Sequence, residues 1–408
     1  MNFRTFLIIT LVSISSPAFA QAPAPAPAPA PVAGFQDGFF VQSPDGEYRF
    51  VFGMVAQADG RFSVDDPTPI TNTFSLRKLR PTLTGQVTRY FTFKLMPDFG
   101  NGTTTVPDAY IELRLSPAFR IRTGKDKTPV GYELLQGDAN LWFMERSQAS
   151  NLVPNRDLGV ELVGDVAGGR LSYQGGLFNG VPDGASSTTE VDTNNSKDFA
   201  GRIVVYPLRT STNPILKGFG FHVGASSGTQ TGALPVFRTS VGQTYYSYDR
   251  EATASGHRTR VSPALFLYAK SFGAFGEFVH STQEVAKSGH VTDVANDAWQ
   301  VSTSWMLTGE AATYGAMRPK NNFNPAQHHW GALQVLARYS ELSVDPVAFE
   351  SGLAANTASQ HAKSFSAAMN WYPNPNMKYY ATFEHTTFEG GATRPSEDVI
   401  LFRTQINF

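Results

Sequence analysis

The sequence contains no cysteine among its 408 residues. Disulfide frameworks, thiolate metal sites and thiol nucleophiles are therefore excluded. Charged residues are scarce, at 16%, and the formal net charge is -1, so the overall charge predicts no nucleic acid as a partner. Beyond the N-terminal segment, no apolar run is long enough for a membrane-spanning helix. If the chain crosses a membrane, it must do so as a closed β-barrel.

The first residues have the features of an export signal. A short apolar run follows Arg4, and the small-residue motif Ala-Phe-Ala ends at Ala20. The run is too short to cross a bilayer, so we expect residues 1–20 to be a signal peptide cleaved after Ala20. An alternating Ala-Pro tract favours polyproline II geometry, and residues 21–45 are expected to form a stiff periplasmic leader. Residues 46–408 show no second linker and are expected to form one domain.

Apolar and polar residues alternate in many segments of this domain, for example in DAYIELRLS (108–116) and in RDLGVELVGD (156–165). A period of two is typical of strands with one apolar and one polar face. About sixteen strands are expected, at 47–62, 74–88, 90–99, 107–116, 119–124, 156–166, 169–179, 198–209, 218–228, 258–270, 272–285, 297–311, 329–344, 363–373, 377–388 and 397–408.

The lengths of these segments and of their connections favour a membrane barrel over a soluble sandwich. Many segments exceed the usual globular strand length, and tight turns such as 270–275 alternate with long loops such as 229–257. Aromatic residues, such as Trp371 and Tyr372, gather near the expected strand ends, as in interfacial girdles. The fold class is therefore expected to be all-β: a transmembrane antiparallel barrel in an outer membrane, with lipid as its surroundings.

The last segment, VILFRTQINF, has its apolar residues in step up to Phe408. We expect it to be the strand that closes the barrel by pairing with the first strand, since an open edge is a liability. The same alternation predicts that Arg403 faces the water of the lumen.

Several motifs together resemble the phosphate-selective porins of the O and P type. They are FSLRKLRPTLTGQVTRYFTFKLMPDFG, DAYIEL, GKDKTPVGYE, FMERS, DLGVEL and DFAGRIVVYP, and the resemblance runs from about Phe50 to Phe408. It implies a sixteen-stranded homotrimeric barrel with an inward-folded constriction loop and a lumen lined with arginine and lysine. It also implies that the outer-membrane assembly machinery reads the last strand.

Side-chain parity places most basic residues of the strands inside the barrel. A charge on the lipid face would cost about 2–4 kcal/mol at the midplane, so these cations are expected to face the lumen. The candidate pore-lining and anion-binding residues are Arg77, Lys78, Arg80, Lys94, Arg114, Arg120, Arg122, Lys125, Lys127 and Arg202.

Arg77 has the opposite parity to Lys78 and Arg80. It can turn inward together with Lys78 only if a bulge or a strand end lets both side chains do so. The resemblance implies a basic pair at this position near the constriction. Lys78 departs from the arginine of the family and keeps the charge without the bidentate geometry, which weakens the case for tight phosphate recognition.

Residues 124–155 form the longest irregular stretch that still contains packable side chains, Leu134, Trp142 and Phe143 among them. Such a loop can fold back into a wide barrel, as the resemblance implies, or remain a solvated external loop. In the first case Lys125 and Lys127 lie near the narrowest part.

Two carboxylates, Asp98 and Glu133, are expected to balance these cations, because conduction requires that an anion can leave again. The sequence predicts no cofactor, no metal ligand set and no catalytic residue.

The favoured function is passive, anion-preferring diffusion, with phosphate or polyphosphate as the candidate selected solute. One alternative is a general porin for small solutes, because Glu112, Asp157 and Glu161 also face inward. The other is an outer-membrane barrel hydrolase, although the scattered histidines show no metal-binding spacing and GASSG (224–228) is not a nucleophile elbow.

Overall fold

The structure is a computed structural model that describes residues 32–64, 70–187, 192 and 194–408. The predicted signal peptide and the leader up to residue 31 lie outside the described residues. Within the described part, no helix is long and apolar enough to cross a membrane.

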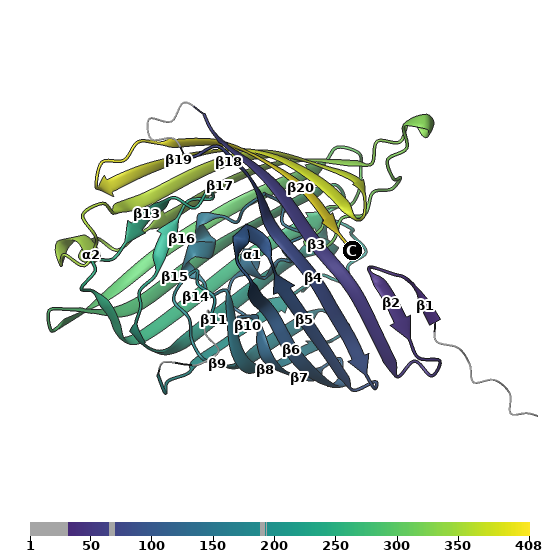
Figure 1. Cartoon of the computed structure of the whole chain (residues 1–408), viewed down its shortest axis with the longest axis horizontal. Helices are drawn as coiled ribbons and strands as arrows, with labels where there is room; N and C mark the ends of the chain where they lie inside the picture. Colours follow the sequence, from purple (N-terminus) through teal and green to yellow (C-terminus); the bar gives the residue numbers. More distant parts are fainter. Residues whose placement is uncertain (1–31, 65–69, 188–191, 193) are drawn as a thin grey trace, which may run out of the picture.

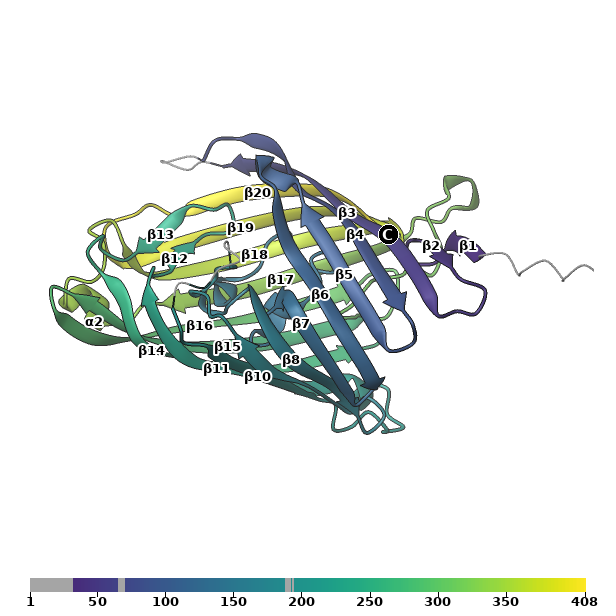
Figure 2. The same cartoon turned by 60° about the horizontal axis from the view of Figure 1, so that its bottom comes forward.

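The described residues form a closed barrel of sixteen antiparallel strands (Figures 1 and 2). These are β3 (Tyr48–Ser63), β4 (Thr73–Val87), β5 (Phe91–Asp98), β6 (Thr105–Ser116), β7 (Phe119–Lys127), β8 (Arg156–Val166), β9 (Leu171–Phe178), β10 (Asp198–Val205), β11 (Phe219–Gly232), β14 (Thr253–Ala269), β15 (Phe272–Lys287), β16 (His290–Met306), β17 (Ala332–Ser343), β18 (Ser359–Asn374), β19 (Met377–Gly391) and β20 (Glu397–Asn407). Each of the sixteen predicted ranges overlaps one of these strands, so the predicted fold class is confirmed.

The barrel closes between its last and first strands. β20 pairs with β3 in antiparallel register from Val399 opposite Ser63 to Asn407 opposite Val55. Phe408 continues this pairing, because its amide donates to the Met54 carbonyl at 3.0 Å and its carbonyl accepts from the Met54 amide at 2.8 Å. The prediction that the final segment is the closing strand is therefore confirmed.

Side chains alternate between an apolar exterior and a polar interior along the strands. On β14, Val261 and Leu265 are exposed on the outside, whereas Arg260 and Ser262, on either side of Val261, are buried inside. Similar exposed residues continue around the barrel on several strands: Ile111, Val160, Phe199, Val301, Trp305, Phe365, Met369 and Phe402. So broad an apolar surface would be a liability in water, and in a bilayer it is the lipid-facing belt.

The connections follow the predicted alternation of tight turns and long loops in most places. Besides the longer connection 206–218 at the short-turn end, two connections depart from it clearly. On the end that carries the long loops, β15 and β16 are joined by the tight turn at Ser288 and Gly289. On the end with the short turns, β16 and β17 are joined by the long segment 307–331. At these two places the predicted alternation is wrong, and the range predicted as a strand up to 311 ends at Met306.

A hairpin precedes the barrel within the range predicted as an extended leader. β1 (Val32–Phe35) pairs with β2 (Phe39–Gln42), and β2 continues the sheet by pairing with residues 49–52 of β3, next to the end of β20. The connection is Gln36-Asp37-Gly38, in which Asp37 and Gly38 both have positive φ, and the φ of 140° at the second is one that glycine tolerates. The part of the predicted leader from Val32 to Gln42 is therefore a hairpin that extends the barrel wall.

Replacing Phe408 tests this closure. Its ring lies 5.7 Å from that of Phe39 and 6.3 Å from that of Phe35, so Phe408→Ala should lower the stability of the folded barrel by about 1–3 kcal/mol. In gel electrophoresis of samples heated to increasing temperatures, the band of the folded barrel should therefore disappear at a lower temperature than in the wild type.

Deleting Phe408 removes its backbone hydrogen bonds as well and should reduce membrane assembly, with the reversal potential of inserted channels unchanged. Wild-type insertion of the deletion variant would contradict this role.

Candidate functional site: the narrowed lumen

The segment between β7 and β8, residues 128–155, folds into the barrel and crosses to the opposite wall (Figure 1). We call it the lumen loop. It contains the helical turn α1 (Tyr132–Leu135) and the 3-10 segment η2 (Gln148–Leu152). Its backbone carbonyls accept hydrogen bonds from strands far away in sequence: Lys378 donates to Leu141 at 2.6 Å, and Asn370 donates to Trp142 at 2.8 Å. The predicted inward fold of this loop is therefore confirmed.

Apolar anchors fix the lumen loop to the wall. The Trp142 ring lies 5.2 Å from that of Phe275 and 5.9 Å from that of Tyr268, and its indole N–H donates to the Thr313 carbonyl at 3.0 Å. Leu134, Trp142 and Phe143, which the sequence marked as packable, are all buried. Burial of these side chains opposes the entropy of ordering a long loop.

Glu133 ties the loop to the far side of the barrel. Its carboxylate accepts from Arg338 on β17 at 3.3 Å and from Gln300 on β16 at 2.9 Å, and also from the amide and hydroxyl of Ser147 within the loop. The Arg338 side chain is 1% exposed. Glu133 is thus a structural anchor that faces no open part of the lumen.

Asp138 ties the loop to the first strands. It pairs with Lys78 at 3.2 Å, with Arg146 at 2.7 Å and also with Arg80, whose other carboxylate partner is Asp98 at 2.6 Å. Burial alone would raise the pKa of Asp138, but the surrounding cations, Lys78 and Arg146 foremost, hold it well below its usual range. The carboxylate therefore remains ionised and keeps these cations occupied.

The lumen loop separates two cavities in the lumen. The outer cavity, of about 520 Å³, lies toward the long loops, and the inner cavity, of about 380 Å³, lies toward the short turns. The neighbouring loop residues Leu134 and Leu135 line different cavities. A solute that crosses the barrel has to pass the loop at this level.

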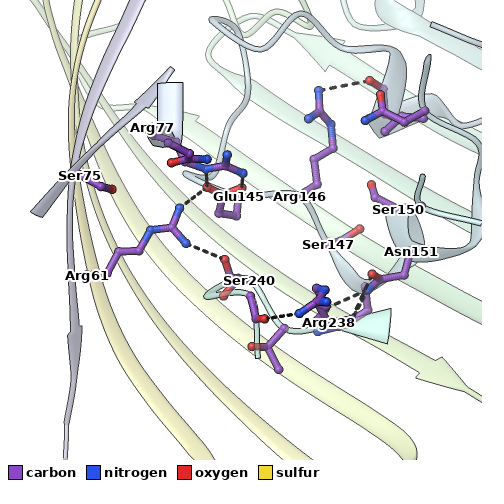
Figure 3. A pocket seen from close by; sticks show the side chains of 17 residues that line it. Arg61, Ser75, Arg77, Glu145, Arg146, Ser147, Ser150, Asn151, Arg238 and Ser240 are labelled. Atoms are coloured by element: carbon purple, nitrogen blue, oxygen red, sulfur yellow. Dashed lines mark hydrogen bonds and ion pairs between the residues drawn. The ribbon is translucent and has the colours of Figure 1, made fainter. Parts of the chain in front are cut away.

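Basic side chains outnumber acidic ones in both cavities. Four arginines line the outer cavity, Arg61, Arg77, Arg146 and Arg238, with one carboxylate among its described lining residues, Glu145 (Figure 3). Serine, threonine and asparagine side chains form much of the remaining surface. Four cations also line the inner cavity, Arg120, Arg122, Lys127 and Arg202, against two carboxylates, Asp126 and Asp165.

Arg77 enters the lumen through a bulge. β3 and β4 pair Gln57 with Lys78 and Ala58 with Leu76, so Arg77 is an extra residue without a partner on β3. A bulge of this kind re-aims the side chain, and Arg77 points toward Glu145, with its side chain 31% exposed. This is the irregularity that the sequence required if Arg77 and Lys78 were both to turn inward.

The structure divides the other predicted cations into lining and structural groups. Lys78 and Arg80 are buried beneath the lumen loop against Asp138. Lys94 pairs with Asp108 at 2.6 Å, and Lys125 donates to the Ser187 carbonyl at 2.9 Å. None of these four lines either cavity.

The remaining predicted strand residues lie toward the short-turn end. Arg114 pairs with Glu112 at 2.7 Å, is half exposed and lines neither cavity. Arg120, Arg122 and Arg202, which parity directed inward, line the inner cavity, and so does Lys127, which the sequence analysis placed near the narrowest part. Arg122 is fully engaged by Glu112, Asp126 and Glu161, whereas Arg202 binds Gln174 and has no carboxylate partner among the described residues.

Two expectations about individual side chains are corrected. Arg403 faces inward but does not meet the lumen water, because it is buried between Asp59 and the lumen loop with 1% exposure. Asp98 and Glu133 balance Arg80 and Arg338 rather than Lys125 and Lys127.

Four lining or balancing residues were missed by the sequence reasoning: Arg61, Glu145, Arg146 and Arg238. Parity marks Arg61 as inward-facing on β3, two residues from Asp59, so that signal was present. Glu145 and Arg146 belong to the FMERS motif of the loop, but their direction follows from its tertiary packing. Among the described residues, no group of three or more histidine or acidic side chains is arranged to hold a metal ion.

A closed sixteen-stranded barrel with a lipid-facing belt and a polar lumen narrowed by an inward loop is an outer-membrane porin. The family model "Phosphate-selective porin O and P" matches residues 52–408, and the chain belongs to that family. No curated protein matches the sequence.

Several solved structures share the fold at low identity. The outer-membrane channel DcaP of Acinetobacter baumannii is 10% identical, covers 92% of this chain and 100% of its own, and has a TM-score of 0.58. An anion-selective porin from Comamonas acidovorans is 10% identical, with 89% and 100% covered and a TM-score of 0.54. OprB of Pseudomonas putida is 12% identical, with 89% and 95% covered and a TM-score of 0.55.

Trp142→Ala should loosen the lumen loop. Removing a buried tryptophan costs about 3–5 kcal/mol of packing, so we expect a larger and noisier single-channel conductance in KCl. The matched control is Trp305→Ala, since this residue lies on the lipid face and is 56% exposed. The control should conduct as the wild type does. If both variants behave like the wild type, Trp142 does not hold the loop.

Proposed function

We propose that this porin passes small anions by passive diffusion and prefers them to cations, with phosphate among its solutes. The observation that carries the proposal is the excess of arginine and lysine on both sides of the lumen loop. Among the described residues, four cations and one carboxylate line the outer cavity, and four cations and two carboxylates line the inner cavity. In a narrowed lumen these fixed charges raise the local anion concentration and replace part of the hydration shell of an anion.

The outer cavity supports recognition of oxyanions in particular. Guanidinium groups bind carboxylate and phosphate with two parallel hydrogen bonds, and Arg61, Arg77 and Arg238 line this cavity from three different parts of the chain. The family takes its name from phosphate selectivity, and one of the structural neighbours is an anion-selective porin. Lys78 does not reach the cavity, so its difference from the arginine of the family bears on the loop anchor rather than on the solute.

A general porin with weak selectivity is the second candidate, because several carboxylates also face inward. Glu112 and Glu161, however, both contact Arg122, at 2.7 and 3.0 Å, and are not free to attract cations. The family and the fold are those of a channel rather than of an enzyme.

We also propose that the barrel assembles as a homotrimer in the outer membrane with the help of the assembly machinery. A structure of OmpT from Vibrio cholerae with a similar fold is described as a trimer form. Native mass spectrometry of the detergent-solubilised protein would report three chains if this is right.

The charge mechanism is tested by the double substitution Arg202→Gln and Arg238→Gln. Arg202 lines the inner cavity and Arg238 lines the outer cavity. Neither has a carboxylate partner among the described residues, so the change removes positive charge without leaving a carboxylate unpaired. The ratio of chloride to potassium permeability, from reversal potentials under a KCl gradient, should fall by roughly fivefold or more.

Arg114→Gln is the matched control and should leave that ratio unchanged, because Arg114 lines neither cavity. Added phosphate should block the chloride current of the wild type. A preference of the wild type for cations would overturn the proposal, and absence of phosphate block at any concentration would overturn its phosphate part.

A further inference from the structure

Glu145 lies at the centre of the cationic wall of the outer cavity. Its Oε1 accepts hydrogen bonds from Arg61 at 2.6 Å and from Arg77 at 3.1 Å (Figure 3). It also accepts one from Arg403 at 3.0 Å. The three arginines come from β3, β20 and β4, whereas Glu145 belongs to the lumen loop. A carboxylate of the chain itself thus occupies the place where cations from three strands converge.

Two of these arginines depend on Glu145 to different extents. Among the described residues, Arg77 pairs with Glu145 and with no other carboxylate. Arg61 also binds Asp59 at 3.1 Å and the Ser240 carbonyl at 3.2 Å. If Glu145 moved away, Arg77 would be left with an unpaired guanidinium that faces the cavity.

Arg403 is a partner of Glu145 that lies buried behind the surface of the cavity. It is fixed by two hydrogen bonds to Asp59, at 2.6 and 2.8 Å, and by the Met144 carbonyl at 2.6 Å. The Arg403 side chain is 1% exposed, whereas that of Glu145 is 18% exposed. Glu145 can therefore give up its contacts to the cavity arginines and keep the one to Arg403.

We propose that Glu145 is a tethered competitor for the transported anion. In the resting pore it occupies Arg61 and Arg77, and an entering oxyanion displaces it toward Arg403. This inference rests on the proposed anion-conducting function. A divalent oxyanion such as hydrogen phosphate can engage both arginines at once and should displace Glu145 more readily than chloride does. The tethered carboxylate would thus set both the selectivity and the speed of release, because conduction requires weak binding.

The competitor remains charged over the working range of an outer-membrane protein. Burial would raise the pKa of Glu145, but Arg77, Arg403 and Arg61, with Lys78 nearby, hold it well below its usual range. A carboxylate with a lowered pKa stays ionised as the pH falls past the ordinary glutamate value of about 4.3. Acidification from pH 7 to pH 5 should therefore not release the two arginines.

The test compares Glu145→Gln with Glu133→Gln in planar bilayers, with inorganic phosphate as the probe. Both substitutions remove a negative charge from the lumen loop and weaken one of its anchors, but only the first frees arginines in the outer cavity. Glu145→Gln should lower the phosphate concentration that halves the chloride current by roughly tenfold. Glu133→Gln should not lower it, and neither should moving the wild type from pH 7 to pH 5.

Two results for the half-blocking phosphate concentration would overturn the inference. An unchanged or higher half-blocking concentration in Glu145→Gln would show that the residue only anchors the loop and would overturn the inference. An equal decrease in both variants would overturn it as well, since the effect would then come from loop loosening. Anion preference of the wild type is measured separately by its reversal potential, so failure of the proposed function and failure of this inference give different results.

Discussion

The structure depends on buried ion pairs between the lumen loop and the barrel wall. Glu133, Asp138 and Glu145 reach three different groups of strand cations. Such pairs add little net stability, because desolvation offsets their attraction, but removing one partner of a buried pair costs about 3–5 kcal/mol. Their contribution is position: they fix where the loop crosses the lumen, and this crossing divides the lumen into two cavities.

The lipid environment determines which cations face the lumen and can pair with the carboxylates of the loop. Strands that cross a bilayer must keep charges off the lipid face, so every strand arginine is directed inward. Inside, the loop carboxylates and the strand carboxylates neutralise some of them, such as Lys78 and Arg80, and leave others facing the cavities. The number of inward cations in the sequence therefore overstates the number that a solute meets.

Much of the fold follows from local pattern, and much of the site does not. The period of two located all sixteen strands, and the parity of Arg77 required a bulge or a strand end, of which the structure has the bulge. The pairing of Glu133 with Arg338, or of Asp59 with Arg403, joins residues from distant strands and depends on barrel closure and loop packing. No local pattern encodes such partners. The hairpin turn at Asp37-Gly38 is different, because its sequence signal was present within a segment dominated by proline and alanine.

The most direct test of this account is whether the lumen loop is fixed to the β17–β18 wall. Gln148 of the loop donates to Ser364 of β18 at 3.2 Å, and the chain has no natural cysteine. A Gln148→Cys and Ser364→Cys protein, treated with a short thiol-bridging reagent in intact membranes, should cross-link in high yield. The pair Gln148→Cys and Phe365→Cys should not, since Phe365 faces the lipid. Absence of the first cross-link, or equal yields for the two pairs, would contradict the account.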